Sequence, residues 1–204
     1  MFLNTLINSI IELAVFLVFP FIAYLFTYRK KLSFPEYIGL IKIERKNIKR
    51  SLTFILILSA LFIIISLFML YMVKDVPTAA SKFTSLGISA LPSAIIYSTI
   101  GTAIPEEIIF RGFIAKIFVR KNNYLLGNIV QSTLFGLLHA AMFYIYVGML
   151  KAIITGIFTF LIAYLVCYTN EKKANSSIIP SIIVHSMANL FSCLIAMFSI
   201  MYTF

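Results

Sequence analysis

The octapeptide PEEIIFRG, residues 105–112, places three charged side chains inside an otherwise apolar part of the chain. Glu107 and Arg111 are four positions apart, so on a helix they share one face and can form an ion pair. Glu106 is rotated from Glu107 by about 100° and can point elsewhere. A carboxylate that is withdrawn from water gains a tendency to bind a proton, which suits a general base or acid acting on water.

The chain has only two histidines, and both lie within apolar runs. FGLLH places Phe135 one helical turn before His139, where its ring could shield the imidazole from lipid. SIIVHSMAN places Ser181, His185 and Asn189 on one stripe, and the last two could hold a carbonyl oxygen or a water. Each motif alone is typical of helix packing. Together, on separate spans, they predict one shared polar site, because ionisable groups at membrane depth usually face a cavity or a partner.

The composition indicates a membrane protein, since 61% of the residues are hydrophobic and only 12% are charged. Ordinary globular domains carry about twice that share of charge. We therefore expect a single membrane domain over residues 1–204, without internal repeats or a soluble domain. The net charge of +10 would suggest a nucleic-acid partner for a soluble protein. Here the basic residues lie between apolar runs, so we expect contacts with membrane lipid and no nucleic acid.

Six apolar runs are candidates for membrane-crossing helices of about 20 residues each. They cover approximately residues 5–28, 51–73, 83–105, 124–148, 151–168 and 178–203. The predicted fold class is all-α, a polytopic transmembrane bundle of about six spans. Glu12 interrupts the first run, and we expect it near the external interface.

The third run could end at Pro105, with the charged stretch lying on the membrane surface. It could also continue as one long helix around residues 86–120, kinked at Pro105. The spacing favours the long helix. Glu106 and His139 each lie 15 positions from the turn at residues 121–124. In an antiparallel hairpin both would be roughly 22 Å from that turn, so the carboxylate and the imidazole would face each other inside the membrane.

The connections between the runs predict an orientation. Those on one side carry most of the basic residues, eight of them between residues 29 and 50. The positive-inside rule then places this side in the cytoplasm and both termini outside.

Two forms of hydrolysis are open on these residues. Glu106 and His139 could activate a water, with His185 and Asn189 stabilising the oxyanion. The same four side chains could instead bind one divalent metal ion such as zinc, although the chain has no HExxH motif and no Cys/His cluster. No serine or cysteine stands beside a histidine with an orienting partner, so we expect direct attack by water.

Taken in order, EEIIFR at 106–111, FGLLH at 135–139 and HSMAN at 185–189 resemble the CPBP family of CAAX-protease and bacteriocin-processing membrane endopeptidases. The pattern of that family is EExxxR, FxxxH and HxxxN, and this chain matches all three motifs. The resemblance covers a catalytic core of about residues 90–195 and is closest to compact bacterial members. It implies a helical bundle with its site below the cytoplasmic face, in a bacterial plasma membrane.

The resemblance also implies hydrolysis of peptide bonds in a hydrophobic, lipid-modified or membrane-associated peptide or protein. The implied site residues are, in catalytic roles, Glu106, His139, His185 and Asn189, and in supporting roles, Glu107, Arg111 and Phe135. Two other functions stay open on the sequence. One is a non-enzymatic bacteriocin-immunity or interaction protein that keeps the fold. The other is a small proton-coupled transporter, which the lack of an internal repeat disfavours.

Overall fold

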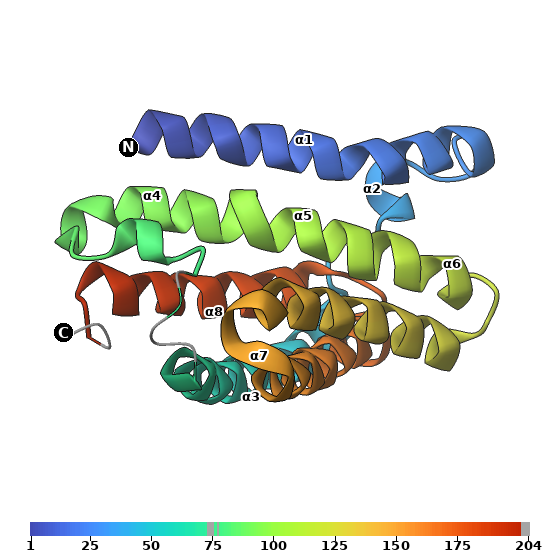
Figure 1. Ribbon diagram of the computed structural model, residues 1–204. Coiled ribbons are helices and arrows are strands. Elements are labelled where there is room, and N and C mark those ends of the chain that lie inside the picture. Colours follow the sequence, from blue (N-terminus) through green and yellow to red (C-terminus); the bar gives the residue numbers. More distant parts are fainter. Residues whose placement is uncertain (73–75, 77, 201–204) are drawn as a thin grey trace.

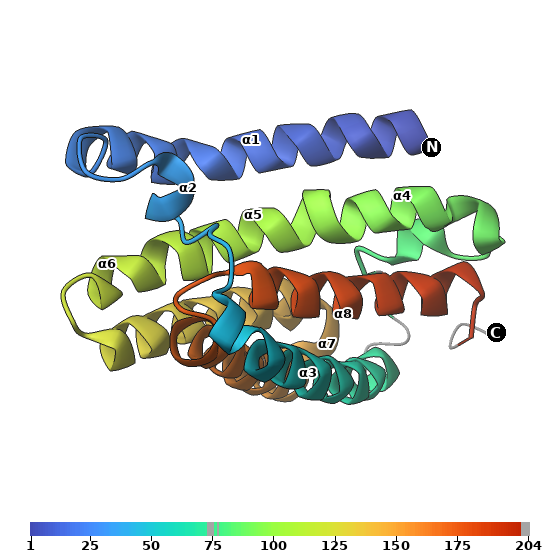
Figure 2. The ribbon, with the colours of Figure 1, turned by 180° about the vertical axis from the view of Figure 1, so that it is seen from behind.

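The computed structural model describes residues 1–72, 76 and 78–200, which form helices and contain no strand. Figure 1 and Figure 2 show these helices running side by side as a bundle. The helices long and apolar enough to cross a membrane are α1 (Phe2–Thr27), α3 (Arg45–Met72), a composite helix (Gly87–Val119), α7 (Tyr124–Lys173) and α8 (Ile179–Met197). The predicted polytopic helical bundle is confirmed. The predicted span ends at residue 73 and at residues 201–203 lie outside the described residues.

The 50 residues of α7 form a hairpin of two helical halves. A straight helix of this length would measure about 75 Å, far more than a bilayer core. Gly148 interrupts it with φ 76° and ψ 173°, a conformation that favours glycine. Beyond this point the chain runs back, because Asn128 and Gln131 donate to the carbonyls of Tyr164 and Ala163 respectively. The two halves of this one helix are the fourth and fifth predicted runs.

The composite helix continues through Pro105 instead of ending there, as expected for residues 86–120. Its segments are η2 (Gly87–Ala90), α4 (Leu91–Ile96), η3 (Tyr97–Ala103), α5 (Ile104–Glu107), η4 (Ile108–Ala115) and α6 (Lys116–Val119). The segments η3 and η4 are π-helical, so wide turns flank α5 on both sides. Wide turns let a helix pass a proline, which lacks the N–H of a regular turn, and they are frequent at functional sites.

The start of α1 and the end of α8 lie at one end of the bundle, and the connections rich in basic residues lie at the other (Figure 1). At the basic end, the short helix α2 (Phe34–Tyr37) leads into a loop that is tied to the start of α8, because the Ile178 N–H donates to the Gly39 carbonyl over 2.9 Å. Lys116 forms an ion pair with Glu171 close by. The basic connections therefore meet on one side of the bundle, as the alternation of spans predicts.

The helices differ in how deeply they are buried. In α8, 44% of the most apolar window is buried inside the bundle, compared with 6% in α1. The composite helix and α3 both pack against α8 (Figures 1 and 2). By contrast, α1 lies at the edge and exposes large side chains such as Phe19 and Phe26, as a lipid-facing helix does. The HSMAN motif thus lies in the core of the bundle.

Candidate active site

The side chain of His185 joins α8 to the composite helix. Its Nδ1 lies 2.9 Å from Oε1 of Glu107, and Nη1 of Arg111 lies 3.0 Å from the same oxygen. All three side chains are buried. A carboxylate oxygen only accepts hydrogen bonds, so Nδ1 of His185 carries a hydrogen and donates it to Glu107. Glu107 therefore holds the guanidinium on one side and fixes the imidazole on the other.

Glu106 faces the second nitrogen of the same imidazole. Its Oε2 lies 3.8 Å from Nε2 of His185. Because Nδ1 is the donor, Nε2 of the neutral ring carries a lone pair, and two acceptors at this distance attract a proton or a hydrogen-bond donor such as water. The Glu106 side chain is 21% exposed, whereas that of Glu107 is 1% exposed. Of the two adjacent glutamates, Glu106 is the one free to act on another molecule.

His139 lies on the first half of α7, beside the same cluster. Its Nδ1 is 2.9 Å from the carbonyl oxygen of Phe135, so Nδ1 donates there and Nε2 remains an acceptor. The Phe135 ring centroid lies 4.3 Å from that of His139 and 6.1 Å from that of His185. No hydrogen bond or ion pair joins His139 to Glu106 within the described part of the chain. The two imidazoles thus share Phe135 as a neighbour, while Glu106 pairs with His185.

Aromatic rings fix the charged side chains of the cluster. The Arg111 Cζ lies 4.5 Å from the Phe135 ring centroid, a cation–π contact. Phe110 meets Phe135 edge-on at 4.9 Å. Phe62 of α3 lies nearly parallel to the His185 ring, at 6.4 Å and 16°. Phe62 was not expected from the sequence, because phenylalanine is spread through every apolar run and nothing marks this one.

Two polar groups on α8 have buried atoms without a hydrogen-bond partner among residues 1–72, 76 and 78–200. They are Nδ2 of Asn189, one turn beyond His185, and Oγ of Ser186, which the sequence analysis did not single out. Buried polar atoms are usually paired, so an unpaired donor beside an ionisable cluster is available to a bound molecule. Asn189 therefore lies on the same helix as His185, and its Nδ2 is available to donate a hydrogen bond to a bound molecule.

The site has residue types that bind metal ions, but their arrangement is not that of a three-ligand metal site. In the described ranges, no group of at least three His, Cys, Asp or Glu side chains is arranged to hold a metal ion. Glu106 and His185 face each other, and His139 bonds to the Phe135 carbonyl through Nδ1.

Comparison with protein families decides the kind of protein. The family model Type II CAAX prenyl endopeptidase Rce1-like matches residues 88–191, just over half of the chain. The chain belongs to this family. The matched range runs from the composite helix past Asn189 and includes every site residue described above except Phe62. No curated protein and no solved structure matches the chain.

Membership in the Rce1-like family agrees with the CPBP resemblance of the three motifs. The chain is a member of a protease family and a multi-pass membrane protein.

The candidate site also depends on close packing of the chain at the basic end of the bundle. A Cβ on Gly112, one residue after Arg111, would lie 2.6 Å from the carbonyl oxygen of Ile38. Glycine at this position lets the loop after α2 press against the composite helix, which supports the turn that carries Arg111.

Proposed function

We propose that the chain is an intramembrane endopeptidase that hydrolyses a peptide bond in a hydrophobic, lipid-modified or membrane-associated peptide or protein. The observation that carries the proposal is the position of Glu106, whose Oε2 faces the Nε2 lone pair of His185 at 3.8 Å while Glu107 fixes the opposite nitrogen. Family membership supports hydrolysis of a peptide bond. The name of the family, CAAX prenyl endopeptidase, supports a prenylated or similarly hydrophobic substrate.

In the proposed reaction Glu106 is the general base. A water bound between Glu106 and His139 gives one proton to the carboxylate while its oxygen forms a bond to the carbonyl carbon of the substrate. The Nε2 of His139 accepts the other hydrogen of this water and orients it. When the carbon–nitrogen bond breaks, Glu106 returns the proton to the leaving amine. The products are a new carboxyl group and a new amine, with the charge and protons balanced.

The tetrahedral intermediate places a negative charge on the former carbonyl oxygen. Nδ2 of Asn189 is the proposed donor to this oxygen, since its hydrogens are unspent in the part of the chain that the structure describes. Donors aimed at a developing oxyanion in a site that excludes water typically contribute about 10²–10³ in rate. Nε2 of His185 is an acceptor in this arrangement, so Asn189 and not His185 is the proposed donor to the oxyanion.

Glu107 and Arg111 are positioning residues in this proposal. They touch His185 or each other, and they fix which nitrogen of the imidazole carries the hydrogen. Without Glu107 the ring could turn and present a donor to Glu106, which would then lose its role as a base.

The site lies well inside the bundle. Glu106 is 13 residues from Val119, the last residue of α6, which corresponds to roughly 20 Å along the helix. We propose that the basic end faces the cytoplasm of a bacterial cell, with both termini outside. A substrate anchored in the plasma membrane would then reach Glu106 from the bilayer or from the cytoplasmic side.

The test is cleavage of a prenylated CAAX-type peptide by purified protein in liposomes, followed by mass spectrometry of the products. We expect Glu106→Gln and His139→Ala each to lower kcat by about 10² or more. Glu44→Gln is the matched control, because Glu44 is half-exposed and lies at the basic end. Metal analysis of the same preparations completes the experiment. Full activity in folded Glu106→Gln protein would refute the proposed mechanism.

The same variants separate the alternatives. An immunity or interaction protein would keep its cellular phenotype in the folded Glu106→Gln variant and would release no cleaved peptide. A proton-coupled transporter would show flux across the liposome membrane without proteolysis.

A further inference from the structure

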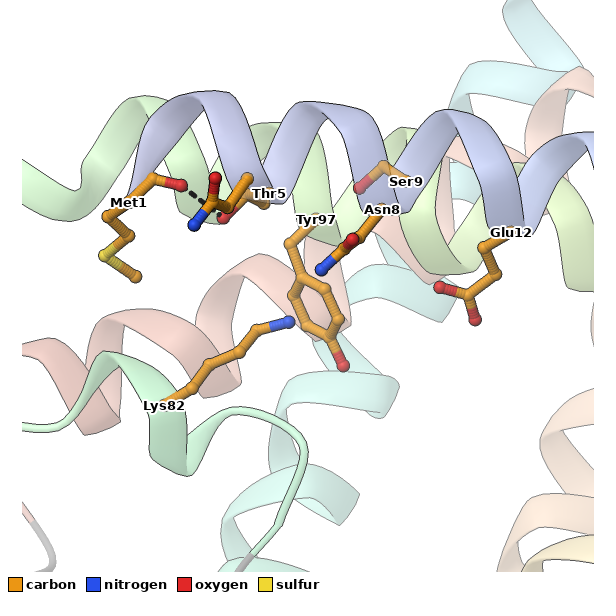
Figure 3. Close-up of a pocket in the computed structure, with 8 residues that line it drawn as sticks. Met1, Thr5, Asn8, Ser9, Glu12, Lys82 and Tyr97 are labelled. Atoms are coloured by element: carbon orange, nitrogen blue, oxygen red, sulfur yellow. Dashed lines mark hydrogen bonds between the residues drawn. The ribbon is translucent and has the colours of Figure 1, made fainter.

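A second polar feature lies outside the site, between the first half of α1 and the composite helix. A groove of about 300 Å³ opens there, and Figure 3 shows side chains of α1 together with Tyr97 and Lys82 around it. Asn4, Asn8 and Glu12 follow one another at intervals of four residues, so they lie on one face of α1. This stripe of polar residues belongs to a helix whose outer face is apolar and exposed.

The polar stripe needs a polar environment. The opposite face of the same helix carries Leu3 and Ile10, which are 63% and 53% exposed, as expected for contact with lipid. A carboxylate and two amides on a membrane helix are costly unless they face water or polar partners. In Figure 3 the side chains of Asn8 and Glu12 point away from α1 on the side where Tyr97 lies. The polar lining favours a hydrated groove on this side of α1.

The groove reaches the depth of the candidate site. A Cβ on Gly101 would lie 2.6 Å from Oγ of Ser9, and Leu13 packs in one cluster with Ile104 and Ile108. The two helices thus run in the same direction, and Glu12 lies at the level of Ile104. That is two residues, or about 3 Å, from the level of Glu106. Glu12 lies about 15 Å along α1 from the start of that helix.

We propose that this groove is a vestibule that brings water to the hydrolytic site from the end of the bundle where α1 begins. The inference rests on the proposed function, because hydrolysis consumes one water for each bond cleaved. A volume of this size corresponds to about ten molecules of liquid water. Asn8 and Glu12 supply hydrogen bonds along the wall, and Lys82 lies over the Tyr97 ring, with Nζ 3.5 Å from the ring centroid.

Thiol labelling tests whether water reaches the face of α1 that lines the groove, and it does not depend on proteolysis. Asn8→Cys and Ile10→Cys place a thiol on opposite faces of α1 at nearly the same depth. The native Cys167 and Cys193 are buried and give little background. A membrane-impermeant methanethiosulfonate added from the side where α1 begins reacts with hydrated thiolates, so we expect modification at least about tenfold faster for Asn8→Cys. Equal rates at the two positions would overturn the vestibule.

The supply of water is tested by kinetics on the prenylated peptide. We expect the double variant Asn8→Leu/Glu12→Leu to lower kcat by about fivefold or more without changing KM, because only the step that uses water is affected. Glu12→Gln keeps the hydrogen bonding and should keep most of kcat. Val15→Leu, on an exposed position of the same helix, is the control. Fast labelling with an unchanged kcat in the double variant would overturn the supply role. A wild-type protein without any cleavage would instead refute the proposed function, and labelling would still decide whether the groove is wet.

Discussion

Two of the clusters of buried polar side chains in this bundle differ in chemistry more than in burial. In the α7 hairpin, Asn128 and Gln131 are fully buried neutral amides that donate to backbone carbonyls of the opposite half. In the candidate site, Glu107 is equally buried but carries a charge that Arg111 balances. Neutral amides bonded across helices are typical of packing inside a membrane, whereas ionisable groups mark function.

The clusters also differ in what they leave unpaired. The hairpin has one buried polar atom without a partner among those described, Oε1 of Gln131. The site has several, including Oε2 of Glu106 and Nδ2 of Asn189. An acceptor and a donor left open near one imidazole can bind the two ends of a reacting group. The two clusters are equally buried. The candidate site differs because it contains charged groups and polar atoms without a hydrogen-bond partner.

The largest effect is expected from removing the partner of a buried charge. Arg111→Met leaves Glu107 uncompensated, and breaking a buried pair in this way typically costs about 3–5 kcal/mol. We expect a large loss of thermal stability in detergent and no cleavage. Differential scanning fluorimetry and the peptide assay measure the two losses.

A double variant shows whether the pair serves the fold or the reaction. Glu107→Leu/Arg111→Met removes both charges, so most of the lost stability should return. Cleavage should remain absent, because His185 no longer has the acceptor that fixes its Nδ1. Recovery of cleavage together with stability would show that Glu107 and Arg111 have no positioning role.

A smaller effect is expected in the α7 hairpin, where a substitution should lower stability without changing the cleavage rate. Gln131→Ala removes the buried hydrogen bond to the Ala163 carbonyl, and the loss of one such bond typically costs about 0.5–1.5 kcal/mol. The cleavage rate for each folded molecule should stay at the wild-type value. Thr133→Ala, at an exposed position of the same helix, is the control for both readouts. A fall in kcat at full folding would mean that the amide cluster also shapes the site.

The candidate site was predicted from the sequence in part, whereas the amide cluster of Asn128 and Gln131 was not predicted. Apolar runs of about 20 residues predict membrane helices because the bilayer forces backbone groups to bond within the helix. The rise per residue fixes depth, so Glu106 and His139 could be placed at one level. The rotation of each helix about its axis is set by packing, which no spacing reveals. This rotation turns Glu106 toward His185 and brings Phe62 of α3 onto the same ring.

The polar groove shows the same limit on prediction from sequence. The spacing of Asn4, Asn8 and Glu12 was present in the sequence, but the parallel packing of α1 on η3 gives that face its meaning. The turn at Gly148 was expected only as a loop between two runs. Its conformation folds the second half of α7 back on the first, so that Asn128 and Gln131 meet the carbonyls of Tyr164 and Ala163.

The smallest effect is expected where a polar cluster is fully exposed, at the start of α2. The backbone N–H and the hydroxyl of Ser33 donate to Oε2 of Glu36 over 2.8 and 2.6 Å, and these bonds lower the pKa of Glu36 below its usual 4.5. A carboxyl with a depressed pKa stabilises the fold above pH 4.5, and this contribution disappears as the pH falls through the lower value in the folded protein. Ser33→Ala should therefore lower Tm slightly at pH 7, and the difference from wild type should shrink steadily below pH 4.5. Cleavage at pH 7 should be unchanged, because α2 lies at the basic end, away from Glu106. A Tm difference that is constant from pH 7 to pH 3 would mean that the Ser33 hydroxyl acts through the backbone of α2 and not through the Glu36 carboxylate, since only the carboxylate titrates in this range.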